Sequence, residues 1–399
     1  MTRKKILHAA YEYHKRVGGI GSVTTGLTPA LAKKGFDVSI VTPFFDVYDD
    51  YYKDKDLKQV TTLTHIYKGV PVKSKLFRVC SEIVDGEPVY HYLIKPMENT
   101  PQAKLFDTNK QETNIYQGES GNRREYFNGA VAAMLRLPDD NVPQFDIYHS
   151  HAWHTGIAAV LAKEFENLPK WRALNKDTKK PLKKIPHMIS TIHMLLPTEH
   201  GQITQAAKIA ELLDSIGLPS DFAQKFTRWK EYINPGHLKQ VALVLLYSDA
   251  VTTVSEGLAH EASHVKGGGQ GLDDLFIHLE KQGRLQGILN GIDYKKFDAT
   301  STKNLSHFAL DPEHITDGKK RLKEYLASKF PKLDPNKMWF GMVSRFAAEK
   351  GMDMLPTAIE AIAKEDGMFI LMGWHVAFVM KDGKLVPRYK EEIDAIRNH

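Results

Sequence analysis

A glycine-rich segment near the N-terminus constrains the fold of this chain more than any other feature. It runs from Arg16 to Ser22, and it follows the short apolar run Ile6–Ala10. A stretch with helical spacing comes next, from Val23 to Lys34, and then a second apolar run, Val38–Val41. The order of strand, glycine loop, helix and strand predicts the start of a doubly wound, parallel α/β sheet.

The same segment is a candidate ligand site. Gly18 and Gly19 allow the backbone to come close to a ligand, and the free N–H groups of the helix that follows suit a phosphate. Arg16 adds a positive charge beside them. The spacing is not G-x-G-x-x-G, however, and many α/β proteins carry a glycine turn here. The segment alone therefore leaves a phosphate site and a structural turn both open.

Length and a second strand–glycine–helix start predict two domains. A chain of 399 residues is too long for one ordinary domain, and the pattern that begins at Ile6 begins again at Phe340. We expect an N-terminal Rossmann-like domain over residues 1–286. Residues 287–399 are expected to hold a linker and part of a second Rossmann-like domain.

Composition limits the possible partners. The net charge of +6 is modest and does not argue for nucleic acid. No apolar run is long enough to span a bilayer, so no membrane partner is expected. Cys80 is the only cysteine, which excludes an intrachain disulfide and a cysteine-rich metal site and is typical of a cytoplasmic protein.

A second candidate site lies at Asp146–His154, which holds three histidines and a tryptophan at the end of a predicted strand. The carboxyl ends of parallel strands are where such sheets bind ligands, and His193 follows another predicted strand in the same way. The alternative is packing, with Trp153 in the core and the histidines bonded to backbone. A zinc site is disfavoured because no cysteine or nearby carboxylate completes the ligands, so we expect neither metal nor cofactor.

Six segments together resemble the motifs of glycogen and starch synthases, in the right order and over essentially the whole chain. The resembling segments, with the family's pattern after each, are Arg16–Gly19 (K-x-G-G), His149–Gly156 (H-x-H-D-W-H-[TA]-G), Asp249–Ser255 (D-A-V-T-T-V-S), Gly271–Asp273 (G-L-[DE]), Gly287–Asp293 (G-I-L-N-G-[VI]-D) and Val343–Gly351 (V-S-R-L-x-x-Q-K-G).

The resemblance implies a GT-B fold, in which two Rossmann-like domains face each other. It also implies retaining transfer of glucose from a nucleotide sugar to the 4-OH end of an α-1,4-glucan, with ADP-glucose more expected than UDP-glucose. Cations must then stabilise the diphosphate that leaves. The expected catalytic residues are His151, Arg345 and Lys350. The expected substrate-binding residues are Arg16, Gly18, Gly19, His193 and Asn290.

Departures from the family pattern keep other functions open. Ala152 stands where the pattern has aspartate, and Met194 stands where it has asparagine. The sequence stops at His399, before the family's pair of glutamates, so we expect a truncated second domain, weak binding of a nucleoside diphosphate and little transfer. A non-catalytic relative that binds a glycan or a nucleotide sugar is the main alternative. An NAD-dependent dehydrogenase is disfavoured because the glycine spacing is wrong for a dinucleotide. The sequence leaves the oligomeric state open.

Overall fold

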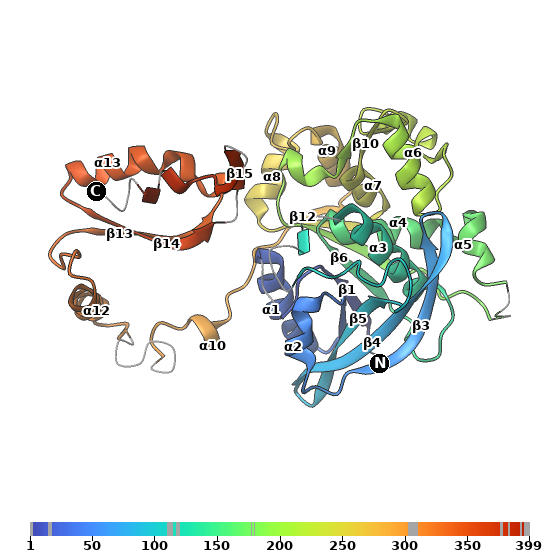
Figure 1. Ribbon diagram of the computed structural model, residues 1–399, viewed down its shortest axis with the longest axis horizontal. Coiled ribbons are helices and arrows are strands. Elements are labelled where there is room, and N and C mark those ends of the chain that lie inside the picture. Colours follow the sequence, from blue (N-terminus) through green and yellow to red (C-terminus); the bar gives the residue numbers. More distant parts are fainter. Residues whose placement is uncertain are drawn as a thin grey trace. The chain divides into compact units, whose positions relative to one another are not determined.

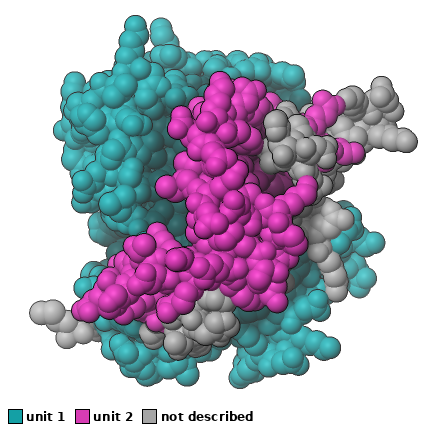
Figure 2. Space-filling view, turned by 90° about the vertical axis from the view of Figure 1, so that its left-hand side faces the viewer, with its two compact units in different colours: residues 1–292 teal, residues 293–399 magenta. Residues whose placement is uncertain are grey.

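The structure is a computed structural model of the 399-residue chain. It describes residues 3–14, 18–109, 115–116, 120–176, 178, 180–301, 310–375, 378–381, 384–391 and 393–394. The chain divides into two compact units, Met1–Ile292 and Asp293–His399, which Figure 2 colours separately. Each unit is described by itself below.

Within the described residues, the first unit is built around a nine-stranded sheet (Figure 1). In spatial order its strands are β12 (Leu285–Gly287), β11 (Ala250–Thr253), β7 (His187–Ile192), β6 (Ile147–His151), β1 (Lys5–Ala9), β2 (Asp37–Pro43), β5 (Glu87–Pro96), β4 (Val70–Val84) and β3 (Lys58–Tyr67). Neighbours from β12 to β5 pair in parallel, whereas β4 and β3 pair antiparallel. The predicted parallel α/β sheet is confirmed, and β4 and β3 extend one edge of it as an antiparallel addition.

Helices connect the parallel strands. Those of the first unit are α1 (Gly19–Lys33), α2 (Asp49–Tyr52), α3 (Ser120–Arg136), α4 (Ile157–Glu164), α5 (Pro169–Ala173), α6 (Ala206–Ser215), α7 (Gln240–Tyr247), α8 (Glu256–His264) and α9 (Asp273–Lys281). The glycine segment therefore leads from β1 to α1 in the predicted order, but the helix begins at Gly19, inside the predicted loop, and not at Val23. The segment around Trp153 joins β6 to α4.

The alternation of side chains along β1 and β6 separates an apolar face from a histidine face. Leu7 pairs in register with Tyr148, and both are fully buried in one apolar cluster with residues of α3 and α4. His8 pairs with His149, so these rings lie on the opposite face of the sheet. Because side chains alternate along each strand, Leu7 and Tyr148 pack into the core on one face of the sheet, and the histidines lie on the other face.

The segment from Met97 to Gly121 differs from expectation. Its polarity predicts a surface loop with few core residues, yet Leu105, Phe106 and Ile115 are at most 9% exposed. The buried guanidinium of Arg123 on α3 donates to the carbonyl oxygen of Leu105 at 2.7 Å. The helix therefore holds Leu105 and its neighbours against the core, a contact that the polar composition of the segment does not predict.

The segment after α6 also differs. The apolar spacing from Leu212 to Lys230 predicts a helix, a turn and a second helix, but α6 ends at Ser215 and Gly217 has a φ of 76°. Short 3-10 turns follow it. A small antiparallel sheet then forms from β8 (Gln202–Ile203), β10 (His237–Lys239) and β9 (Ile233–Asn234).

The second unit holds a parallel pair of strands, β13 (Trp339–Phe346) and β14 (Met368–His375), joined by α13 (Leu355–Lys364). Its other elements are α10 (Tyr294–Phe297), α12 (Ile315–Lys329) and the hairpin β15 (Phe378–Lys381) and β16 (Lys384–Pro387). β1 and β13 belong to separate sheets. The sequence at Lys350 and Gly351 predicts the start of a helix, but α13 begins at Leu355, after two 3-10 turns around Gly351. In the described part of the chain, no helix combines the length and the apolar character needed to cross a bilayer.

Candidate functional site

Four histidines gather where β1, β6 and β7 end. His8 lies on β1, His149 and His151 lie on β6, and His193 directly follows β7. Parallel pairing places His8 beside His149 and places His151 beside Thr191. Because the carboxyl ends of parallel strands meet at one edge of the sheet, residues far apart in the sequence become neighbours here.

The imidazole rings form a hydrogen-bonded chain. His8 Nδ1 lies 3.0 Å from His151 Nε2, and His151 Nδ1 lies 3.0 Å from His193 Nε2. His8 and His151 are at most 1% exposed, whereas His193 is half-buried. His151 therefore has an imidazole partner on each side, which fixes the orientation of its ring.

The cluster carries no charge near neutral pH. Burial lowers the pKa of His8 to about 3 and that of His193 to about 4. Burial holds the pKa of His151 well below its usual value, and the neighbouring histidines lower it further. A neutral imidazole offers one donor and one acceptor. The cluster is therefore suited to hydroxyl groups, and a phosphate needs cations from elsewhere.

Hydroxyl groups on the neighbouring strands orient His149. Its Nε2 lies 2.7 Å from Thr191 Oγ1, which lies 2.7 Å from Thr252 Oγ1 on β11. The His149 ring centroid is 4.4 Å from that of His151, and His149 is half-buried. These two hydroxyl groups link His149 Nε2 to β7 and β11.

The residues after β6 make a sharp turn. Ala152 has φ of 62° and ψ of 167°, a region populated almost only by glycine, and its N–H donates to the carbonyl oxygen of Thr191 at 2.9 Å. Trp153 is 7% exposed and belongs to the core. The Arg124 guanidinium lies 4.5 Å from the centre of its ring. The packing interpretation is thus right for Trp153, but the histidines bond mainly to side chains and not to backbone.

A carboxylate already occupies the glycine loop. Glu12 Oε2 accepts from the N–H of Gly18 at 2.6 Å, and Glu12 Oε1 accepts from the hydroxyl of Tyr116 at 2.6 Å. An added Cβ at Gly19, the first residue of α1, would meet no atom of the described residues within 4 Å. Arg16 lies outside the described residues. The start of α1 therefore binds an anion, and in this structure that anion is the chain's own Glu12.

The remaining predicted residues lie further along the chain. Asn290 is exposed in the segment after β12. Arg345 is half-buried on β13, and Lys350 is exposed in the turn that follows. Of the predicted site residues, the structure brings His151 and His193 into contact.

Sequence reasoning missed His8 and Glu12. A histidine between the apolar residues Leu7 and Ala9 of strand β1 is the available signal for His8, because a buried polar side chain needs a partner. No local signal identifies Glu12, since its partner Tyr116 is more than a hundred residues away.

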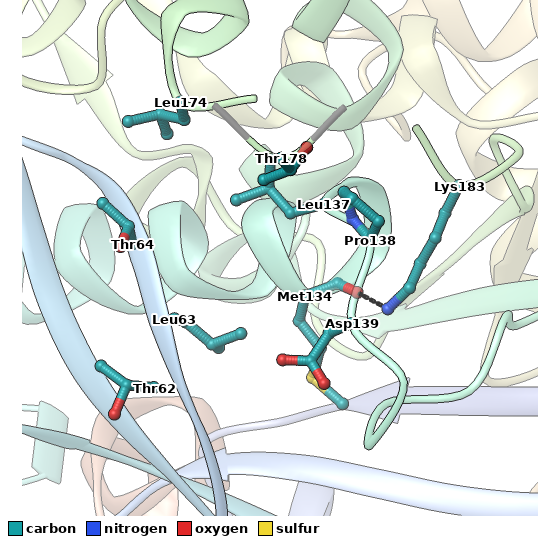
Figure 3. Close-up of a pocket in the computed structure, with 10 residues that line it drawn as sticks. All are labelled: Thr62, Leu63, Thr64, Met134, Leu137, Pro138, Asp139, Leu174, Thr178 and Lys183. Carbon is teal, nitrogen blue, oxygen red and sulfur yellow. Dashed lines mark hydrogen bonds between the residues drawn. The ribbon is translucent and has the colours of Figure 1, made fainter. Parts of the chain in front are cut away.

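A small cavity of about 160 Å³ lies elsewhere in the first unit (Figure 3). It is lined by β3, by the last turn of α3 and by the segment around Lys183. The Lys183 ammonium donates to the carbonyl oxygen of Met134 at 3.1 Å, and burial lowers its pKa to about 8. Since α3 and the loop after it lead into the start of β6, the cavity is not at the strand ends that carry the histidines.

Comparison with known proteins identifies relatives of this chain. Residues 5–278 match the starch synthase catalytic domain. Glycogen synthase of Protochlamydia amoebophila (strain UWE25) is 26% identical over 385 residues, which cover 92% of this chain and 68% of that protein. Glycogen synthase of Pasteurella multocida (strain Pm70) is 28% identical over 378 residues, with the same coverage. The catalytic domain of starch synthase IV from Arabidopsis thaliana, bound to ADP and acarbose, matches with a TM-score of 0.74 at 25% identity, covering 100% of this chain and 72% of that one.

The fold and these matches define a glycosyltransferase of the GT-B class. More narrowly, the chain belongs to the glycogen and starch synthase family, as its motifs imply. It spans about two thirds of the length of the curated relatives named above.

Proposed function

We propose that this chain transfers glucose, with retention at the anomeric carbon, from a nucleotide sugar to the 4-OH end of an α-1,4-glucan. ADP-glucose is the proposed donor in preference to UDP-glucose. The ADP in the similar starch synthase IV structure supports an adenine nucleotide. The observation that carries the proposal is the hydrogen-bonded His151–His193 pair at the strand ends of a chain of this family.

In this proposal His151 and His193 hold the sugar. Neutral imidazoles donate to or accept from hydroxyl groups without placing a charge beside the reacting carbon. Both nitrogens of His151 face other histidines, so a sugar hydroxyl takes the place of one of these partners. His193 is the more exposed of the two and meets the hydroxyl first.

The leaving diphosphate requires positive charge, which we assign to Arg345 and Lys350. Arginine binds two phosphate oxygens at once, and lysine acts as a point charge. Gly18 and Gly19, with Arg16, are the proposed phosphate contacts at the start of α1. A phosphate there must displace the Glu12 carboxylate from the N–H of Gly18.

The same proposal assigns a role to each part of the chain. Residues 1–286 form the acceptor-side domain. Residues 287–399 contain the linker, with Asn290 as a substrate contact, and part of the nucleotide-sugar-binding domain. A cytoplasmic location completes the proposal and is supported by a single cysteine, Cys80, which is free and exposed.

A transfer assay with radiolabelled donors tests the function. We expect transfer of glucose to a maltooligosaccharide to be slow, and to be faster from ADP-glucose than from UDP-glucose. His151→Ala should lower kcat/KM at least tenfold, about 1.4 kcal/mol of transition-state stabilisation. His187→Ala is the matched control, since His187 is exposed at the start of β7. Equal rates for the two variants would contradict the role of His151.

Two observations favour a non-catalytic relative as the second candidate. Ala152 lacks the carboxylate of the family motif, and Glu12 occupies the start of α1. Calorimetry separates the two candidates. Binding of ADP-glucose without any transfer to the oligosaccharide would support the binding protein and refute the transferase.

A further inference from the structure

The histidines at the strand ends have the composition of a transition-metal site. His8, His149 and His151 each offer one ring nitrogen, and these three atoms all lie within 4.8 Å of one another. Two adjacent, paired strands carry them, so the backbone holds their spacing. Sequence reasoning dismissed zinc for want of a cysteine or carboxylate, but it did not count His8 as a ligand.

The distances are close to those of a bound ion. Zinc binds histidine nitrogens at about 2.0–2.1 Å, so two ligands of a tetrahedral ion lie about 3.3 Å apart. His8 Nδ1 and His151 Nε2 are 3.0 Å apart, which differs from that spacing by only a few tenths of an ångström. The third nitrogen, on His149, needs the larger movement. His149 is the half-buried member of the three and has the most room to turn.

The groups around the cluster fit ligand histidines. A histidine that binds a metal usually makes a hydrogen bond through its other nitrogen, which fixes the ring. His149 Nε2 has such a partner in Thr191 Oγ1, and His151 Nδ1 has one in His193 Nε2. Both rings therefore have a hydrogen-bond partner on one nitrogen and can offer the other nitrogen to an ion.

One polar atom of the cluster has no partner in the described part of the chain, and it is the nitrogen of His8 that does not face His151. His8 is fully buried, and its Nε2 has no hydrogen-bond partner among the described residues. Buried nitrogens are rarely left without a partner, because losing their hydrogen bonds to water costs free energy. His8 is thus a buried imidazole with one nitrogen against His151 and the other without a partner.

We propose that His8, His149 and His151 bind a divalent transition-metal cation, Zn²⁺ in the first place. Imidazole suits such ions, whereas Mg²⁺ and Ca²⁺ require oxygen ligands that this cluster lacks. Three protein ligands leave the fourth position of a tetrahedral ion open. The ion takes up the lone pairs of His151, so it competes with any sugar hydroxyl that this residue binds.

Metal binding is measured directly, so the test does not depend on glucosyl transfer. His260 and His264 form an exposed stacked pair one helical turn apart on α8 and could bind metal themselves. All proteins therefore carry His260→Asn and His264→Asn. Equilibrium dialysis with Zn²⁺ gives the affinity and stoichiometry, and Co²⁺ gives a visible absorption band that reports its ligands. We expect one ion per chain.

Matched glutamine variants identify the ligands. His8→Gln and His149→Gln should each weaken Zn²⁺ binding at least tenfold. His65→Gln, at another fully buried strand histidine, should leave it unchanged. Circular dichroism checks folding, and if His8→Gln does not fold, His149→Gln decides. The proposal would be overturned if the protein with His260→Asn and His264→Asn bound no ion. It would also be overturned if His8→Gln and His149→Gln folded and kept the same affinity for Zn²⁺.

Discussion

Adjacent glycines at the start of α1 have different surroundings, although the sequence motif treats them alike. A Cβ at Gly18 would lie 3.2 Å from Glu12 Oε1, whereas a Cβ at Gly19 would lie more than 4 Å from every atom in the described part of the chain. Among the described residues, nothing sterically requires glycine at position 19. If glycine is needed there, the reason is the close approach of a ligand.

Gly19→Ala tests this residue. We expect the free energy of unfolding to stay the same or rise by up to about 1 kcal/mol, because alanine is the better helix former. The KM for ADP-glucose should rise, because the methyl group intrudes on the phosphates. Gly26→Ala is the control, since Gly26 is exposed in the middle of α1 with the same open surroundings. The same KM in both variants would show that Gly19 has no contact with the donor.

The residues of the candidate site differ in how far their contacts can be predicted from the sequence. His151 and His193 are predictable, because each follows a recognisable strand. Their bond to each other, and the bond of His151 to His8, depend on the register of three strands, which no local pattern fixes. Glu12 is harder still, because its role depends on a loop and on the distant Tyr116.

At the level of elements, a carboxylate holds the glycine-rich loop before α9. Asp273, the first residue of α9, accepts from the N–H groups of Gly267 at 2.7 Å, Gly271 at 3.2 Å and Gly269 at 3.4 Å. Glu12 makes the same kind of contact at the start of α1. In both loops a carboxylate of the chain itself accepts from backbone N–H groups that precede a helix.

Asp273→Asn should weaken this loop. The charged acceptor of several backbone N–H groups is lost, so we expect the free energy of unfolding to fall by about 1–3 kcal/mol. Urea denaturation followed by circular dichroism measures the change. Asp274→Asn is the matched control, because Asp274 is the exposed neighbour on the same helix turn. Equal stabilities would mean that the loop does not depend on this carboxylate.

Long elements are predictable from the sequence, and short ones are not. The period of two and the apolar runs identify the longer strands of the large sheet and helices such as α7, but not the three-residue strand β12. The small sheet of β8, β9 and β10 is not predicted, because strands of two or three residues carry almost no sequence pattern. The burial of the loop before α3 is not predicted either, because its few buried side chains stand among many polar ones in the sequence.

At the scale of the whole molecule, the order of motifs along the chain is the most informative feature of the sequence. It predicts the α/β fold and the family, both of which are confirmed. It does not predict how many histidines the fold buries. Besides the cluster at the strand ends, His65 and His91 are fully buried on β3 and β5.

These buried histidines make the stability of the chain depend on pH. Burial lowers the pKa of His65 to about 3 and holds the pKa of His91 well below its usual range, with His14 and Lys55 lowering the latter further. An unfolded histidine titrates near about 6.5, so between these values the unfolded chain binds more protons than the folded one. The stabilisation is fully present above about pH 6.5 and is lost progressively as the pH falls towards the folded pKa.

We therefore expect the free energy of unfolding to decrease below about pH 6.5, with a slope that approaches about 1.4 kcal/mol per pH unit for each such histidine. His65→Gln removes one of them, so its slope should be shallower by about that amount, even though the loss of the bond to Ser74 lowers its stability at every pH. Urea denaturation at several pH values between about 7 and about 5 measures both slopes. His187→Gln, at an exposed position, should keep the slope of the parent. A His65→Gln slope equal to that of the parent would mean that His65 gains its proton in the folded state and that burial does not exclude the charge.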